Sequence, residues 1–182
     1  MDFSNPRILK ECIDFLKSDE MFGTECTLYG VGFSMGGNHL LRYLGSVKEE
    51  LGSDSGLKSA ITIGNPFDCL STGLQLKYTL YGIYDSVLRK SISKPFVLKR
   101  FRQLRNLSEE HVSQMKQSKT LYEFDQNYRA KFFAYSSVHK LYRGVSCGPY
   151  LPNVDIPFLV LLSNDDPITK VELVPHGDLL RN

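Results

Sequence analysis

The chain has 182 residues, of which 42% are hydrophobic and 23% are charged, and this ordinary globular mixture is long enough for one sizeable core. The net charge of +2 gives no argument for nucleic-acid binding. The four cysteines, at positions 12, 26, 69 and 147, lack the paired spacing of a zinc site or a disulfide framework, which favours a reducing compartment.

The first twenty residues predict an amphipathic helix that begins near Ser4, with Pro6 in its first turn. They lack the basic start and the apolar block of a signal peptide. No apolar run in the chain approaches the roughly 20 residues that span a bilayer. We therefore expect a cytoplasmic protein, or one that binds a membrane peripherally.

Three apolar, β-prone runs predict three strands, at residues 27–33, 57–63 and 156–163. The first run carries no charge, which suits a strand covered on both faces of a parallel sheet. Polar turns follow the second and third runs, at 64–68 and 164–167. With helices between the runs, this order predicts an α/β fold with a mostly parallel, doubly wound sheet, in which functional residues collect where strands end.

The segment from about residue 73 to residue 143 contains no clear apolar strand and is rich in Tyr, Phe, Lys and Arg. Helical periodicity is visible over residues 84–101, where Pro95 interrupts it, and over 108–117. We expect a helical cap insertion at 73–143 over the edge of the sheet, within a single partial domain that spans 1–182.

A serine between two glycines, in the stretch GFSMG at 32–36, directly follows the first predicted strand and precedes a helix. A serine hydroxyl becomes a nucleophile only when it is exposed, aligned and deprotonated by a neighbour, and a sharp strand-to-helix turn exposes it. Gly32 and Gly36 provide the small residues that such a nucleophile elbow requires, and the N–H of Met35 would be an oxyanion donor. We therefore predict that Ser34 is a nucleophile, or descends from one.

The competing interpretations of this motif are a chance match and a glycine-rich phosphate loop. The lysine of the phosphate loop is missing here, and so is the spacing of a dinucleotide-binding loop. A buried strand before the motif and an apolar helix after it are the context that a nucleophile elbow predicts.

Four stretches follow one another along the chain: GFSMGGNHLLRYLG, AITIGNPFD, YRAKFFAYSSVHKLYRGV and IPFLVLLSNDDPI. In this order they resemble the landmarks of the YheT-like, embryogenesis-associated branch of the α/β-hydrolases, which are serine esterases or lipases related to serine aminopeptidases. The resemblance runs from about residue 7 to the end of the chain. It implies Ser34 as nucleophile, the Met35 N–H in the oxyanion hole and an acid after the penultimate strand, with no metal and no organic cofactor.

Asp166 is our choice for that acid, because this kind of hydrolase usually has its aspartate directly before the proline of such a turn. Asp165 is a neighbouring competitor, and Asp68, after the preceding strand, is the other place where an α/β-hydrolase can carry its acid. In the purely structural interpretation Asp165 and Asp166 only form a turn ahead of Pro167, and Asp68 caps a helix or shapes a loop.

The catalytic histidine is harder to place. The triad order in this fold is serine, acid, histidine, and only His176 follows Asp166. The surroundings of His176 resemble a helix and loop more than the turn after a last strand, so it is a weak candidate for the base. We expect His39 and His111 to be surface or packing residues on helices, and His139 to have a structural role.

The resemblance also implies a second oxyanion donor from a loop after an early strand, and no such segment precedes Ser34. We therefore expect the C-terminal portion of a hydrolase, truncated at both ends. Loss of the general base costs about 10⁶ in turnover, and loss of an oxyanion donor about 10² to 10³ more. The isolated polypeptide is then expected to be nearly inactive.

Residues 88–106 hold seven basic residues and no acidic one. They form either a solvated cap face or a surface for anionic lipid headgroups, with apolar side chains in the acyl region. The expected function is a carboxylic ester hydrolase of the α/β-hydrolase family that acts on lipid or short- to medium-chain acyl esters. The alternatives are a catalytically inactive fragment that binds lipid or a protein partner, and peptidase or acyltransferase chemistry on the same triad.

Overall fold

The computed structural model describes residues 5–95 and 108–180. The chain divides into two compact units. The sheet unit comprises Met1–Cys69 and Val145–Asn182, and the helical unit comprises Leu70–Gly144. The expected cap insertion, 73–143, lies within the helical unit, while its placement over the sheet's edge stays a prediction.

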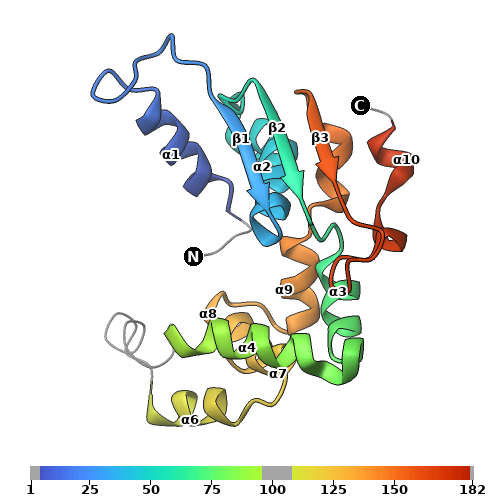
Figure 1. Cartoon of the computed structure of the whole chain (residues 1–182). Coiled ribbons are helices and arrows are strands. Elements are labelled where there is room, and N and C mark those ends of the chain that lie inside the picture. Colours follow the sequence, from blue (N-terminus) through green and yellow to red (C-terminus); the bar gives the residue numbers. More distant parts are fainter. Residues whose placement is uncertain (1–4, 96–107, 181–182) are drawn as a thin grey trace. The chain divides into compact units, whose positions relative to one another are not determined.

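The sheet unit is built on three parallel strands, β1 (Tyr29–Phe33), β2 (Ser59–Ile63) and β3 (Phe158–Leu161), in the order β1-β2-β3 (Figure 1). Each strand lies within one of the three runs that the sequence predicted. The α/β fold class and the parallel sheet are therefore confirmed, and they are consistent with a partial α/β-hydrolase fold. Because the strands are parallel, the residues that follow all three of them lie at one edge of the sheet.

Helix α2 (Met35–Leu51) covers one face of this sheet. Its apolar residues Leu40, Leu41, Leu44 and Val47 are buried in the core. The strand residues beneath it are small: a Cβ placed on Gly30 would lie 3.0 Å from Leu40 Cδ1. Small residues on the strands thus allow the helix to lie close to the sheet.

The remaining helices of the sheet unit are short. Helix α1 (Arg7–Leu16) confirms the expected N-terminal helix, but it begins at Arg7, with Pro6 at its N-cap and not in its first turn. Ser4 lies outside the described residues. The others are η4 (Gly148–Asn153), η5 (Val171–Leu173) and α10 (His176–Leu179). At Gly45 the backbone of α2 approaches η4 so closely that a Cβ there would lie 2.1 Å from the carbonyl oxygen of Tyr150.

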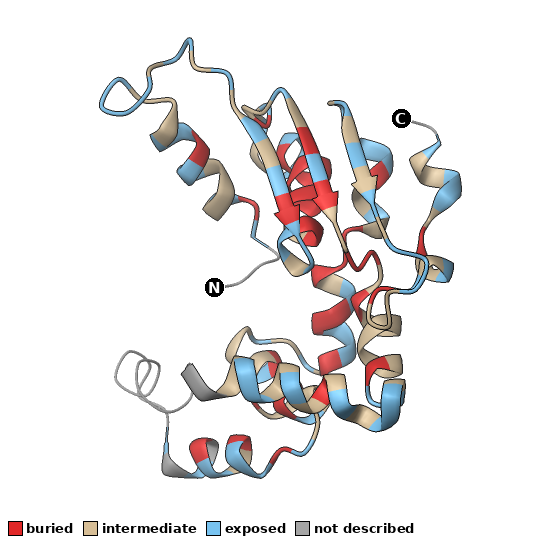
Figure 2. Cartoon of the chain, viewed as in Figure 1, coloured by how far each residue is buried: buried red, intermediate tan, exposed pale blue. Residues whose placement is uncertain are grey.

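The other face of the sheet is exposed (Figure 2). Six large apolar side chains on it are 36% to 66% exposed: Tyr29, Val31, Phe33, Ile61, Leu159 and Leu161. The expectation that residues 27–33 are covered on both faces is therefore wrong for the described part of the chain. An uncharged run predicts a strand that can be buried on both faces, but it does not identify the segment that covers each face.

The described elements of the helical unit are all helices. They are α3 (Cys69–Leu76), which starts in the sheet unit, η1 (Thr79–Gly82), α4 (Ile83–Pro95), α6 (Glu109–Gln117), α7 (Leu121–Phe124), η3 (Asp125–Arg129), α8 (Ala130–Phe132) and α9 (Val138–Val145), which returns to it. Val112, Met115, Phe124 and Tyr128 form a core of this unit. Within 5–95 and 108–180, no helix has the length and apolar composition to cross a bilayer.

Turn η3 is a π-helix with a buried acidic residue. The Asp125 carboxylate lies 3.2 Å from Arg129 Nη1 and accepts a hydrogen bond of 2.8 Å from the Tyr142 hydroxyl. Burial raises the pKa of Asp125 and outweighs these two partners. The polar cluster is thus internal to the helical unit.

Only the first part of the basic stretch 88–106 belongs to the described structure. Residues 88–95 lie in α4. Residues 96–106, which include its apolar residues Phe96, Val97, Leu98 and Phe101, lie outside the described residues. A lipid-binding surface at this stretch stays a prediction.

Candidate active site

Ser34 lies in the turn between the end of β1 and the first residue of α2. Its backbone angles are φ 48° and ψ −124°, a conformation that non-glycine residues rarely adopt, and its side chain is exposed. Such strain costs of order 1–3 kcal/mol and persists only where the surroundings impose it. This is the geometry of a nucleophile elbow, in which a sharp turn presents a serine hydroxyl to solvent.

Backbone hydrogen bonds hold Ser34 on both sides. Its N–H donates to the carbonyl of Ile63 in β2 over 2.8 Å. Its own carbonyl accepts from the N–H groups of Gly37 and Asn38, at 3.0 and 3.2 Å. The strand and the helix therefore fix the two peptide groups that flank the strained residue.

Two glycines allow the strand and the helix to meet at this turn. A Cβ on Gly32 would lie 2.5 Å from the Cα of Gly37, and a Cβ on Gly37 would lie 3.0 Å from the Cβ of Thr62. At Gly36, by contrast, a Cβ would meet no described heavy atom within 4 Å. A side chain at Gly32 or at Gly37 would therefore displace its neighbours. The sequence analysis did not identify Gly37, although a Gly-Gly pair in the first turn of a helix is a signal that could have indicated it.

Met35 is the first residue of α2, half-buried, with its sulfur 4.0 Å from the sulfur of Cys69. The N–H groups of a first helical turn lie outside the helix's own hydrogen-bond ladder and point out of its N-terminus. The helix dipole favours negative charge at the same place. Met35 N–H has the setting of an oxyanion donor, and this role stays a prediction.

Asp166 lies at the same edge of the sheet as the elbow. Its Oδ2 is 3.8 Å from the place of a Cβ on Gly64, the residue that follows Ile63. The carboxylate is bound within its own loop: it accepts from Ile168 N at 2.8 Å, from Thr169 N at 3.1 Å and from the Thr169 hydroxyl. Burial alone would raise the pKa of Asp166, but these hydrogen bonds outweigh it and lower the pKa below its usual value.

The two competing acids lie in different surroundings. Asp165 is exposed and accepts a hydrogen bond from the Ser163 hydroxyl. Asp68 is half-buried directly before α3. Of the three acids, Asp166 is the one whose carboxylate lies beside Gly64, at the end of β2. The choice among the three acids stays a prediction.

No histidine is joined to the serine in the part of the chain that the structure describes: the Ser34 hydroxyl makes no hydrogen bond with any residue there. His176 is exposed at the start of α10. His139 is exposed on α9 and contacts the ring of Tyr122 edge-on, with 5.8 Å between ring centroids. His111 lies in α6, and its side chain is outside what is described.

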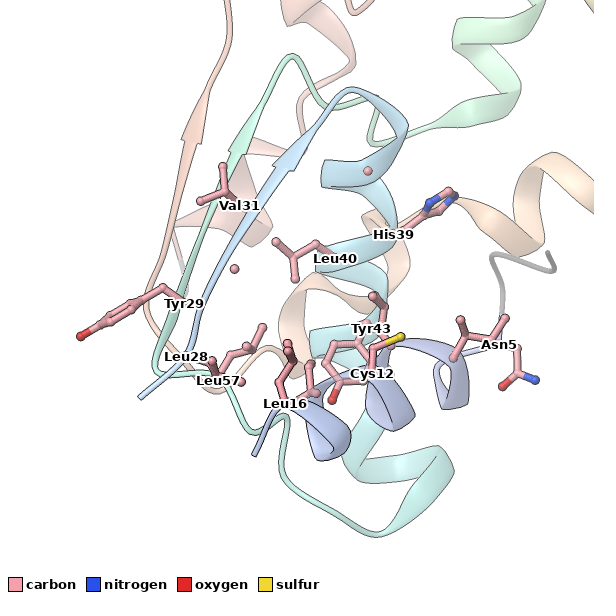
Figure 3. A pocket seen from close by; sticks show the side chains of 15 residues that line it. Asn5, Cys12, Leu16, Leu28, Tyr29, Val31, His39, Leu40, Tyr43 and Leu57 are labelled. Atoms are coloured by element: carbon pink, nitrogen blue, oxygen red, sulfur yellow. The ribbon is translucent and has the colours of Figure 1, made fainter. Parts of the chain in front are cut away.

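An apolar cavity of about 370 Å³ lies in the sheet unit between α1, α2 and the free edge of β1 (Figure 3). Cys12 and Leu16 of α1, Val31 of β1, and Leu40 and His39 of α2 are among its lining residues. Gly36, two residues after Ser34, also lines it. The position of His39 beside apolar side chains of this cavity is consistent with the packing role expected for it.

The described residues offer no group of three or more His, Cys, Asp and Glu side chains that could hold a metal ion. The most buried thiol, Cys147, is fully enclosed, and burial raises its pKa to about 12. A thiol in that environment stays protonated at neutral pH and is a poor nucleophile. Cys147 is thus a poor nucleophile candidate, whereas Ser34 is exposed and strained.

Substitution of the two elbow glycines is expected to have different effects. Gly32→Ala should lower the free energy of unfolding by about 1–3 kcal/mol, because its Cβ has to displace the backbone of α2. Gly36→Ala should be neutral or stabilising by up to about 1 kcal/mol, because its Cβ has room in a helix. Urea unfolding followed by circular dichroism measures both, and equal losses of stability would contradict the close contact at Gly32.

The lowered pKa of Asp166 depends on the donors in its loop. Because the folded pKa lies below the unfolded value of about 3.9, the stability that Asp166 contributes is present at neutral pH and lost as the pH falls through its folded pKa. Thr169→Val, which removes a hydroxyl donor, should raise the pKa of Asp166, whereas Thr169→Ser should preserve it. Titration of the carboxyl ¹³C chemical shift tests this, and a pKa common to both variants would disprove the contribution of the hydroxyl.

The chain is similar to several curated proteins, including the following three. Human phospholipase ABHD3 is 32% identical over 150 residues, which cover 79% of this chain and 34% of the relative. The monoacylglycerol lipase of Saccharomyces cerevisiae is 25% identical, with coverages of 80% and 32%. The embryogenesis-associated protein EMB8 of Picea glauca is 24% identical, with coverages of 99% and 39%.

The chain therefore spans about a third of the length of the curated relatives it matches. No family model and no solved structure matches it. The matches cover most of the chain, and the parallel sheet with the strained serine at its edge is consistent with them. Homologues from the α/β-hydrolase family therefore cover most of this chain, each aligned over a part of its own length.

Proposed function

We propose that the chain supplies the serine nucleophile of a carboxylic ester hydrolase that acts on lipid or short- to medium-chain acyl esters. The single observation that carries this proposal is the positive φ of Ser34 at the junction of β1 and α2. The names of the relatives, a phospholipase and a monoacylglycerol lipase, support an ester of a lipid as the substrate class.

In the proposed reaction the Ser34 hydroxyl oxygen attacks the ester carbonyl carbon, while a general base removes the hydroxyl proton. The carbonyl oxygen becomes negative and accepts a hydrogen bond from the N–H of Met35, at the positive end of α2. The tetrahedral intermediate expels the alcohol, which takes the proton from the base and leaves an acyl-serine. Water, deprotonated by the same base, then attacks the acyl carbon. The bond from that carbon to the Ser34 oxygen breaks, the oxygen takes the proton from the base, and the carboxylic acid is released.

Asp166 would orient the histidine that acts as this base. Two features support Asp166: it follows β3 at the edge where Ser34 follows β1, and its low pKa keeps the carboxylate ionised at neutral pH. His176 is the histidine of this chain that comes after Asp166, and the exposure of its side chain leaves it accessible. Its assignment as the base has to be tested, because it makes no hydrogen bond with Ser34.

The lack of a hydrogen-bonded base at Ser34 favours a second candidate function. Within the described residues the Ser34 hydroxyl has no hydrogen-bonded base, and a serine without a base is a weak nucleophile. The chain would then bind a lipid or a protein partner without catalysing hydrolysis. The two candidates differ in whether Ser34 reacts with an electrophile that mimics an ester.

Labelling with a fluorophosphonate probe separates the two candidates. The hydrolase proposal predicts that the purified chain is labelled and that Ser34→Ala abolishes labelling, since removal of a serine nucleophile costs about 10⁶ in turnover. Ser136→Ala, at another exposed serine, should leave the labelling rate unchanged. A folded chain without labelling would refute the hydrolase proposal for this polypeptide and favour binding without catalysis.

The triad acid is identified by comparing Asp166→Asn, Asp165→Asn and Asp68→Asn in the same assay. Loss of the orienting carboxylate lowers kcat by roughly 10⁴ in serine protease triads, so Asp166→Asn should nearly abolish labelling. The other two variants should retain it. His176→Ala then tests the base: retained labelling would exclude His176 from that role.

A further inference from the structure

The buried side chain of Asn38 has no role in the proposed chemistry, yet both ends of its amide form hydrogen bonds. Its Oδ1 accepts from the N–H of Cys147 over 2.8 Å, and its Nδ2 donates to the carbonyl of Val145 over 2.6 Å. Asn38 is fully buried, in the first turn of α2, four residues after Ser34. One partner is a donor and the other an acceptor, and the amide satisfies both because it carries an acceptor and a donor on separate atoms.

The segment that Asn38 binds, residues 145–148, is itself joined to the segment after β2. The N–H of Gly148 donates to the carbonyl of Phe67 over 3.1 Å. The N–H of Cys69 donates to the hydroxyl of Ser146 over 2.9 Å. The first turn of α2 is thus linked through Asn38 to the two places where the chain leaves and re-enters the sheet unit.

The backbone of Asn38 also contacts the candidate nucleophile. Its N–H donates to the carbonyl of Ser34 over 3.2 Å, beside the corresponding bond from Gly37. A strained residue keeps its conformation only where its surroundings fix it from several directions. One residue therefore links the carbonyl of Ser34, through the helix, to a buried segment more than 100 positions away in the sequence.

We propose that Asn38 is a positioning residue, which anchors the first turn of α2 on Val145 and Cys147 and thereby holds Ser34 in its strained conformation. The consequence for reactivity rests on the proposed function of Ser34, whereas the anchoring does not. Removing the amide would leave a buried carbonyl and a buried N–H unpaired, which costs more than the net contribution of the bonds themselves.

Two substitutions of Asn38 and one matched control test this role. Asn38→Leu keeps the size of the side chain and removes both hydrogen bonds, while Asn38→Asp keeps an acceptor for Cys147 and loses the donor to Val145. Tyr43→Phe is the control: it lies on the same helix, nine residues after Ser34, and removes one buried hydrogen bond of 2.8 Å to Ser55.

Amide hydrogen exchange is the deciding measurement, because it separates a local change at the elbow from a general loss of stability. We expect Asn38→Leu to speed exchange at the amides of residues 37 and 38 by at least about tenfold relative to amides in the last turns of α2. In Asn38→Asp the amide of Cys147 should stay protected while residues 37 and 38 exchange at an intermediate rate. Tyr43→Phe should leave the elbow amides unchanged.

Three results would overturn the proposal. The first is unchanged exchange at residues 37 and 38 in Asn38→Leu, and the second is a uniform rise of the exchange rates along all of α2 in that variant. The third is failure of both Asn38 variants to fold while Tyr43→Phe folds. Fluorophosphonate labelling of the folded variants gives a separate readout, with a rate at least about tenfold lower in Asn38→Leu than in Tyr43→Phe. Absence of labelling in the unmodified chain would refute the proposed function, while the exchange rates would still decide the role of Asn38.

Discussion

The close contact between the end of β1 and the first turn of α2 is the constraint on which the candidate site depends. The backbone at Gly32 and Gly37 is so close that neither position has room for a side chain without displacement. A turn this tight forces the residue between strand and helix into a positive φ, and Ser34 occupies that position. The hydrogen bond from its N–H to Ile63 ties the strained residue to the next strand, so the sheet contributes to the strain that exposes the hydroxyl.

Most of the fold could be predicted from local patterns, because the strands are apolar, β-prone runs and the helices have apolar residues at helical spacing. The runs around Val31, Ile61 and Leu159 each form a strand, and the apolar residues after Ser34 form a buried helix face. The exposed face of the sheet could not be predicted, because an apolar run indicates that a strand suits burial without identifying its cover. The π-helical turn Asp125–Arg129 also has no local signal, since its buried carboxylate depends on Tyr142, a partner from another helix.

The candidate site was predictable where one short motif carries it and unpredictable where it depends on contacts between distant segments. The serine between two glycines was sufficient to find the elbow, because the motif and its strand-to-helix context are local. The steric need at Gly37 and the anchoring by Asn38 depend on Thr62, Val145 and Cys147, which are remote in sequence. The assignment of the acid and the base has the same difficulty, since the relevant side chains come from separate loops.

The backbone conformation of Ser34 is the quantity to measure first, because the proposed chemistry and the proposed role of Asn38 both start from it. A crystal structure of the 182-residue chain would give it directly. We expect a φ near 48°, an exposed hydroxyl and a hydrogen bond from Ser34 N to the Ile63 carbonyl. A negative φ at Ser34, with a relaxed turn and no bond to Ile63, would show that the motif does not form a nucleophile elbow in this chain.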